Sequence, residues 1–278
     1  MSPLWRDQVR IVLCPNRVIL VRLRKGWRRE IIDKQVVQCA STDDANANWK
    51  SAMATFAAAV KEPRWQNADA VLILSNHFVR YLLVPWSDRV LSEEEQLALV
   101  RHHAAEIYGD TSTTWEYRIS TGGMDAPWVA SGVERALLSE SRVIIGAAKL
   151  RLRSVQPYLM SAFNGWRHEF GRDTQWFVLM EEGSLCAMLL HRGQWHSVRL
   201  RRVGEDWLEQ AELMLKRESL LNDLPGDIRK IRMHAPEKMS GVPAALDKCP
   251  IILLKPKLLP GLSQNQASEY AMALAEVA

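Results

Sequence analysis

Two groups of residues in this chain have types and spacing that metal binding or acid catalysis can use. His102 and Glu106 fall four residues apart in a predicted helix, with His103 beside them, a spacing that two metal ligands can share. No HEXXH motif and no third ligand cluster accompany them, so a solvated helix face is the preferred interpretation. The acidic run Glu93–Glu95 follows Ser92 at the predicted start of the same helix, which is typical of a capped first turn.

Glycine, serine and cysteine patterns add no catalytic signature. Gly122 and Gly123 predict a turn, because neither GxGxxG nor GxxxxGK[ST] surrounds them. No serine lies in a GxSxG elbow. The four cysteines form no CxxC pair and are predicted to be reduced thiols in or near the core: Cys14, Cys39, Cys186 and Cys249. We therefore expect a protein that is not an enzyme, with no metal and no cofactor.

The bulk composition fits a globular protein with one large core or two smaller ones. The chain has 278 residues, 47% hydrophobic, 24% charged, and a net charge of +4. The charge is too small to argue for nucleic acid, and no RRM, KH or zinc-finger signature is present. The N-terminus has no signal-peptide pattern, and runs such as Val71–Leu74 are too short to span a bilayer. We expect a cytoplasmic protein that meets a membrane only through a partner.

An internal repeat is the clearest feature of the sequence. Val9–Gly26 and Trp176–Gly193 both read as strand, tight turn, strand and glycine, with one constant offset of 167 residues. A third strand follows each, at Trp27–Val37 and Gln194–Val203. An amphipathic helix comes next in each half, with stripes of Trp49, Met53, Phe56 and Val60, and of Trp207, Ala211, Met214 and Leu215. The strands Ala70–Leu74 and Ile228–His234 close the two units.

A further α+β segment is predicted between the halves. Leu91–Tyr108 is expected to be a helix with the stripe Leu97, Val100, Ala104 and Ile107. The other predicted elements are strands at Trp115–Ser120, Pro127–Ser131 and Leu152–Gln156, and helices at Ser139–Leu150, from Pro157 to about Phe170, and at Gln266–Val277. The predicted domains are 1–170, carrying an inserted subdomain at about 85–150, and 171–278.

Two βββαβα halves, one with an insertion, resemble the actin-like ATPase fold, a duplicated ribonuclease H-like α/β arrangement. Within it the chain is similar to the PilM/GspL family, cytoplasmic scaffolds of type IV pilus and type II secretion platforms. The segments that carry this resemblance are Leu74–Trp86 with the capped helix at Ser92, Leu152–Tyr158, and Ser268–Ala275.

The resemblance also locates the nucleotide-binding positions, and there the sequence departs from active members. An Asp-x-Gly turn is expected in each hairpin, where glycine admits phosphate and aspartate positions Mg²⁺ or water. The first hairpin has Cys14 and Asn16 around a proline, and the second has Glu181 and Gly183. His234-Ala235-Pro236-Glu237 replaces the Gly-Gly that would bind adenosine. We expect these degenerate sites to be inactive.

The resemblance implies a scaffold at the cytoplasmic face of the bacterial inner membrane. Its expected partner is the cytoplasmic N-terminal tail of a PilN- or GspM-like membrane protein, with an assembly ATPase as a second contact. The residues chosen for tail binding are Phe78, Arg80 and Trp86, the last because Pro85 fixes an aromatic side chain of the type found at binding hot spots. Whether a membrane anchor follows in the native chain stays open.

Two rival interpretations remain. The first is an active actin-like ATPase or small-molecule kinase that binds Mg-ATP, with Glu181 replacing the usual aspartate. The second is a two-domain binding module unrelated to actin, in which the 167-residue repeat is coincidental. Separately, arginines alternate along the hairpins and predict solvent-facing strands, with an acidic partner's docking surface or proximity to anionic lipid as the alternative: Arg22, Arg24, Arg28, Arg29, Arg199, Arg201 and Arg202.

Overall fold

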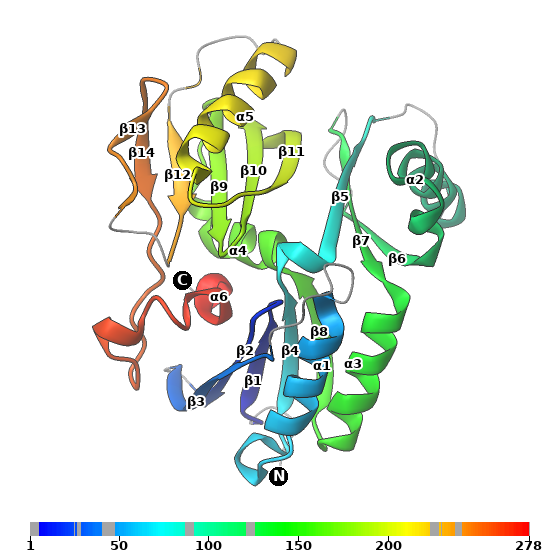
Figure 1. The fold of residues 1–278 in the computed structure, drawn as a ribbon, viewed down its shortest axis with the longest axis vertical. Helices are drawn as coiled ribbons and strands as arrows, with labels where there is room; N and C mark the ends of the chain where they lie inside the picture. Colours follow the sequence, from blue (N-terminus) through cyan, green and yellow to red (C-terminus); the bar gives the residue numbers. More distant parts are fainter. Residues whose placement is uncertain are drawn as a thin grey trace. The chain divides into compact units, whose positions relative to one another are not determined.

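The computed structural model describes residues 6–24, 26, 29–40, 48–86, 92–120, 126–222, 228, 230–236 and 241–277 (Figure 1). The chain divides into two compact units. Unit 1 comprises Met1–Phe78, Arg135–Trp166 and Lys255–Ala278, and unit 2 comprises Val79–Glu134 and Arg167–Leu254. Among the described helices, none is long and apolar enough to cross a membrane.

Unit 1 is built on a five-stranded sheet in the order β3-β2-β1-β4-β8. Its strands are β1 (Gln8–Leu13), β2 (Arg17–Arg24), β3 (Glu30–Gln38), β4 (Asp69–Leu74) and β8 (Arg151–Pro157). Its helices are α1 (Asn48–Ala59), α3 (Arg135–Ala147), α4 (Tyr158–Trp166) and α6 (Ala271–Leu274). The hairpin strands β1, β2 and β3 are antiparallel, whereas β4 and β8 run parallel to β1.

The apolar run of β4 explains its central place in this sheet. All six of its residues are buried, as expected for a strand with parallel neighbours and both faces covered. Helix α1 packs against β1, β2, β3 and α3. Its predicted stripe is confirmed, since Met53 and Phe56 are fully buried. The Ser141 hydroxyl of α3 lies 3.7 Å from the Met53 sulfur.

A buried arginine ties the end of the chain to the middle of β1. Arg10 is 2% exposed, and its guanidinium donates to the Ala273 carbonyl, to Ser161 Oγ and, through two nitrogens at 3.0 Å, to Glu276 Oε2. Burial is the main cause of its lowered pKa, which Glu276 partly opposes. At Gly165 of α4, an added Cβ would collide with the Ala275 carbonyl oxygen. The C-terminal segment is therefore held by both a charge pair and close backbone packing.

The sheet of unit 2 has the order β11-β10-β9-β12-β14-β13. Its strands are β9 (Gln175–Glu181), β10 (Ser184–His191), β11 (Gln194–Arg202), β12 (Ile231–His234), β13 (Ala245–Leu246) and β14 (Cys249–Leu253), and its helix is α5 (Trp207–Asn222). Helix α5 buries Trp207, Ala211, Met214 and Leu215 against β9, β10 and β12, which confirms the predicted stripe. The arrangement repeats that of unit 1, since β9 pairs antiparallel with β10 and parallel with β12.

The strand bounds preserve the repeat found in the sequence. β1 begins at Gln8 and β9 at Gln175, and β2 begins at Arg17 and β10 at Ser184, so both pairs keep the 167-residue offset. A hairpin, a third strand, a helix and a parallel strand follow one another in both sheets. The interpretation that the repeat is coincidental is therefore not supported.

A three-stranded antiparallel sheet in the order β5-β7-β6 completes unit 2. It consists of β5 (Val79–Val84), β6 (Trp115–Ser120) and β7 (Trp128–Glu134), with α2 (Glu93–Tyr108) packed on one face. Ser92 caps α2, as predicted, and Glu95 completes a capping box with it. One predicted core residue is wrong: Ile107 is 64% exposed. The buried stripe instead continues from Ala104 to Tyr108, whose ring packs edge-on against Trp115 at a centroid distance of 5.1 Å.

Several element bounds differ from those predicted. Helix α3 begins at Arg135 instead of Ser139, α4 ends at Trp166 instead of Phe170, and the long C-terminal helix is reduced to α6 with short 3-10 turns beside it. Strands β13 and β14 were not predicted. Gly122 and Gly123 lie outside the described residues. The two units also divide the chain differently from consecutive domains, because Lys255–Ala278 returns to unit 1 and Val79–Glu134 groups with unit 2.

Candidate functional site

The turn of the first hairpin, in unit 1, offers little to a phosphate. Cys14 is 4% exposed, and its N–H donates to the Arg17 carbonyl at 2.9 Å, so that donor is used within the turn. Pro15 has no N–H, and the Asn16 carbonyl accepts the Cys39 N–H at 2.7 Å. The Cys14 thiol lies 3.7 Å from the Met272 sulfur. No carboxylate is present between β1 and β2 to hold Mg²⁺.

The turn of the second hairpin, in unit 2, keeps more of the expected chemistry. Gly183 has a φ of +72°, a left-handed conformation that glycine adopts readily. Its carbonyl accepts the Val203 N–H at 3.1 Å. Glu181 is 7% exposed, and its charge helps raise the pKa of the Cys186 thiol, although burial is the larger cause. Of the expected Asp-x-Gly turn, the second hairpin therefore has the glycine and a buried carboxylate.

At the end of β12, where the resemblance places the adenosine-binding Gly-Gly, lies the buried His234. This side chain is 1% exposed, and its Nδ1 is 2.9 Å from the Leu254 carbonyl. Burial lowers the pKa of His234 from 6.5 to about 4, which keeps the ring neutral near pH 7. A neutral Nδ1–H then donates to the Leu254 carbonyl, a structural role.

Taken individually, these positions do not fit Mg-ATP as the expected Asp-x-Gly turns would. The first turn supplies neither a carboxylate nor a row of N–H donors. The second supplies a glutamate and a glycine, and the strand end supplies a buried neutral imidazole. Within the described ranges no cluster of histidine, cysteine, aspartate or glutamate could hold a metal ion. His102 and His103 instead pair with Glu106 along an exposed helix face, at 3.4 Å and 3.1 Å.

The segment chosen for tail binding lies at and beyond β5. Phe78 is 9% exposed and is therefore largely covered. Arg80, on β5, is half-buried, and its guanidinium donates to the Val79 carbonyl at 3.0 Å. Trp86 is 40% exposed, unusually open for so large an aromatic side chain. The candidate surface in unit 2 thus comprises Arg80 and Trp86.

Two further residues, Tyr108 and Arg199, join this surface, of which the sequence had marked only Arg199, as one of the alternating arginines. Strand β11 lies beside β5 within unit 2 (Figure 1). Burial raises the pKa of Tyr108, while the charges of Arg80 and Arg199 lower it, so both arginines lie near this phenol. The Tyr108 hydroxyl is 3.5 Å from the Tyr81 carbonyl oxygen. Positions 80, 108 and 199 are far apart in the chain, and no spacing rule would have joined them.

Arg199 is fixed in place by a buried glutamate. Its Nε lies 2.8 Å from Glu218 Oε1, and Ser197 Oγ donates to Glu218 Oε2 at 2.7 Å. Glu218 is 4% exposed, whereas the Arg199 side chain is half exposed. The arginine therefore holds its position at the surface. We call Arg80, Trp86, Tyr108 and Arg199 the β5/β11 surface.

The duplicated hairpin, helix and parallel strand, with an inserted α+β sheet, define an actin-like ATPase fold, as predicted, and solved structures agree. A chain of the PilM-PilN type IV pilus biogenesis complex matches with a TM-score of 0.70 over 97% of this chain and 96% of that chain, at 12% identity. A Bacteroides thetaiotaomicron protein with actin-like ATPase fold and unknown function matches at 0.62, over 99% and 98%, at 10% identity.

The cytoplasmic domain of EpsL, an inner membrane component of the type II secretion system of Vibrio cholerae, also matches. Its TM-score is 0.55, over 82% of this chain and 81% of that chain, at 9% identity. The predicted resemblance to the PilM/GspL group is thus confirmed in the fold. No family model and no curated protein matches the sequence.

Proposed function

We propose that this protein is a non-catalytic scaffold of a type IV pilus or type II secretion-like assembly platform. It acts in the cytoplasm at the inner membrane, where it binds the cytoplasmic tail of a membrane partner. The observation that carries the proposal is the near full-length match to a chain of the PilM-PilN complex. The turn at Cys14 and Pro15 offers no free N–H group to a phosphate, which supports a role without ATP hydrolysis.

The β5/β11 surface is the proposed tail-binding site. Arg80 and Arg199 supply guanidinium groups near Tyr108, and Glu218 holds Arg199 in place. Trp86, six residues beyond Arg80 in the chain, supplies an open aromatic ring. An extended tail with a carboxylate for the arginines and an apolar side chain for Trp86 fits this chemistry. A PilN- or GspM-like membrane protein would supply the tail, and an assembly ATPase would make a separate contact.

Peptide binding tests this assignment. A labelled peptide with the N-terminal tail sequence of the PilN-like protein from the same genome is titrated by fluorescence anisotropy. We expect Trp86→Ala and Arg80→Ala each to weaken binding by at least about tenfold, as hot-spot residues do. Both side chains are on the surface or half-buried, so folding should survive. Arg118→Ala, an exposed arginine on β6, is the matched control. Unchanged affinity in both test variants would remove this surface from the proposal.

The second candidate is an active actin-like ATPase or kinase, favoured by the buried Glu181 and the left-handed Gly183. Thermal unfolding with and without Mg-ATP separates it from the scaffold. Nucleotide at about 100 times its Kd would add about 2.7 kcal/mol and move the midpoint by a few degrees. A shift that Glu181→Ala removes would establish nucleotide binding, whereas no shift is expected of the scaffold.

A further inference from the structure

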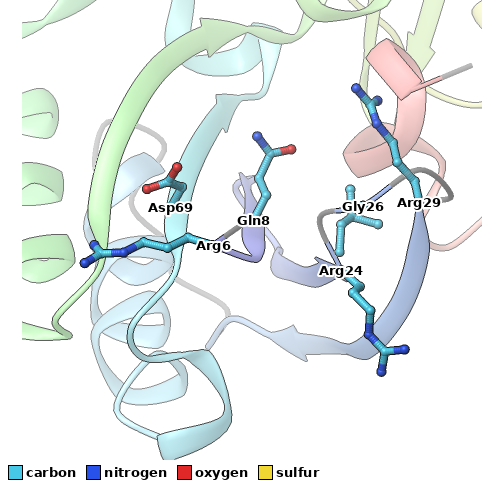
Figure 2. Close-up of a pocket in the computed structure, with 7 residues that line it drawn as sticks. Arg6, Gln8, Arg24, Gly26, Arg29 and Asp69 are labelled. Atoms are coloured by element: carbon cyan, nitrogen blue, oxygen red, sulfur yellow. The ribbon is translucent and has the colours of Figure 1, made fainter. Parts of the chain in front are cut away.

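Unit 1 contains a pocket at the amino ends of β1 and β4. Its cavity volume is about 230 Å³, and its lining residues are Arg6, Gln8, Leu23, Arg24, Gly26, Arg29 and Asp69 (Figure 2). Gln8 and Asp69 are the first residues of these two parallel strands and are register partners. The hairpin turn of Cys14 and Asn16 follows the opposite end of β1. The pocket is thus separate from the position where an actin-like protein would bind phosphate.

The buried carboxylate of Asp69, which we call the floor of the pocket, belongs to a lining residue. The Asp69 side chain is 5% exposed, and its Oδ2 forms an ion pair with Arg153 Nε at 2.9 Å. Its Oδ1 is buried without a hydrogen-bond donor among the described residues. Leu23, across Gln8 from Asp69 in the sheet, is 2% exposed and provides an apolar wall. A buried carboxylate oxygen costs free energy unless a donor reaches it, so this floor favours a ligand with a hydroxyl or ammonium group.

Two guanidinium groups at the rim carry uncompensated charge. Arg6 and Arg29 are exposed, and neither forms an ion pair or hydrogen bond with the described residues. In Figure 2, Arg6 lies on the Asp69 side of Gln8, and Arg29 lies on the side of Gly26. Arg24 differs, because its guanidinium pairs with Glu30 at 2.9 Å. With Asp69 paired to Arg153, the described lining residues keep a net surplus of two positive charges, from Arg6 and Arg29.

We propose that this pocket binds a small phosphate ester that carries a hydroxyl or ammonium group, of the kind found in glycerophosphates and phospholipid headgroups. The phosphate lies between Arg6 and Arg29, and the hydroxyl or ammonium donates to Asp69 Oδ1. Figure 2 shows the two guanidinium groups pointing away from each other, so both flexible side chains turn toward the opening when the phosphate binds. Guanidinium groups match phosphate oxygens in geometry and charge. The cavity, about 230 Å³, is smaller than most pockets for drug-sized ligands, which favours a small ester. The assignment is independent of the proposed scaffold function.

Calorimetric titration with sn-glycerol 3-phosphate tests the proposal on the full chain. Inorganic phosphate and glycerol are the comparison probes. We expect glycerol 3-phosphate to bind several-fold tighter than inorganic phosphate, and Arg6→Gln with Arg29→Gln to weaken it by at least about tenfold. Arg118→Gln, at an exposed arginine in unit 2, should leave affinity unchanged. Equal binding by the double variant, or binding of no phosphate probe in solution or on vesicles, overturns the proposal.

The floor is tested separately. Asp69→Asn should abolish the preference for glycerol 3-phosphate over inorganic phosphate, because the amide presents a donor where the carboxylate accepts. If this variant unfolds through loss of the Arg153 pair, Gln8→Ala replaces it and should weaken glycerol 3-phosphate binding several-fold. If the folded variant still binds glycerol 3-phosphate more tightly than inorganic phosphate, the ligand's hydroxyl does not donate to Asp69 Oδ1.

Vesicle sedimentation identifies the source of the ester. Phosphatidylglycerol and phosphatidylethanolamine vesicles are compared with phosphatidylcholine, whose quaternary ammonium cannot donate to Asp69. If the protein binds phosphatidylglycerol and phosphatidylethanolamine vesicles and the Arg6 and Arg29 substitutions abolish this binding, the pocket is assigned to a lipid headgroup. Binding of glycerol 3-phosphate without vesicle binding assigns it to a free metabolite. Equal binding to all three vesicle types contradicts the donor requirement.

Discussion

Replacing Glu276 by alanine should release the C-terminal segment from the unit 1 sheet. The side chain is 30% exposed, but its partner Arg10 is 3% exposed and receives no comparable carboxylate from elsewhere in the described chain. In Glu276→Ala the guanidinium keeps the Ala273 carbonyl and Ser161 Oγ as acceptors and loses its counter-charge. A buried charge without its partner is strongly unfavourable.

The expected cost follows from two opposing effects. Charge-assisted hydrogen bonds contribute about 1.5–3 kcal/mol, and breaking a fully buried ion pair costs about 3–5 kcal/mol. Water can reach the space left by Glu276 because that side chain is partly exposed, which reduces the penalty. We therefore expect Glu276→Ala to lower the free energy of unfolding by about 2–3 kcal/mol.

Urea unfolding followed by circular dichroism measures this loss, and hydrogen exchange of residues 271–277 localises it. Glu269→Ala, at an exposed glutamate of the same segment, is the control and should change stability by less than about 0.5 kcal/mol. Arg10→Met removes the charge that needs compensation. In a double-mutant cycle, Glu276→Ala should therefore cost about 1–2 kcal/mol less in the Arg10→Met background. Additive effects, or a Glu276→Ala cost equal to the control's, would refute the reasoning.

Two further predictions concern stability. The pKa of His234 is lowered from 6.5 to about 4 in the folded protein, so the unfolded chain binds a proton more readily as the pH falls. The free energy of unfolding should therefore fall by about 2 kcal/mol between about pH 7 and pH 5. Urea midpoints across this range should fall less in His234→Gln, and an equal fall would contradict the assignment. Gly165→Ala should lower the free energy of unfolding by about 1–3 kcal/mol, because the added methyl group collides with Ala275. Gly146→Ala, at an open helix position, should raise it by about 0.5–1 kcal/mol. Equal effects of the two substitutions in thermal melts would exclude the collision.

The sequence predicted the hairpins and the central helices well because their patterns are local. Alternation and turn residues located β1, β2, β9 and β10, and the 3.6-residue periodicity located α1, α2 and α5. The capping box at Ser92 was readable from a four-residue window. Ile107 shows the limit of this method, because helical spacing alone does not decide whether the stripe continues at Ile107 or at Tyr108. The short strands β13 and β14 also gave too weak a pattern.

The candidate sites depended much more on tertiary structure. The sequence identified the residues in the two hairpin turns and singled out Arg80 and Trp86, but it did not join Arg80 to Tyr108 and Arg199. It gave no sign that Arg6, Arg29 and Asp69 line one pocket, since these residues come from separate strands and loops. Periodicity reports neighbours within one element, whereas a site collects residues from several.

The sequence by itself therefore determined the duplicated order of strands and helices and the residue types of the two hairpin turns. Both are matters of residue type and short spacing: Pro15 lacks an N–H in any fold, and a 167-residue offset is visible without coordinates. Tertiary structure decided that Lys255–Ala278 returns to the first sheet and that Arg10 is buried to receive it. An arginine in a β-strand reads as solvent-facing, and only the packing of a distant segment supplies the carboxylate and carbonyl that make its burial tolerable.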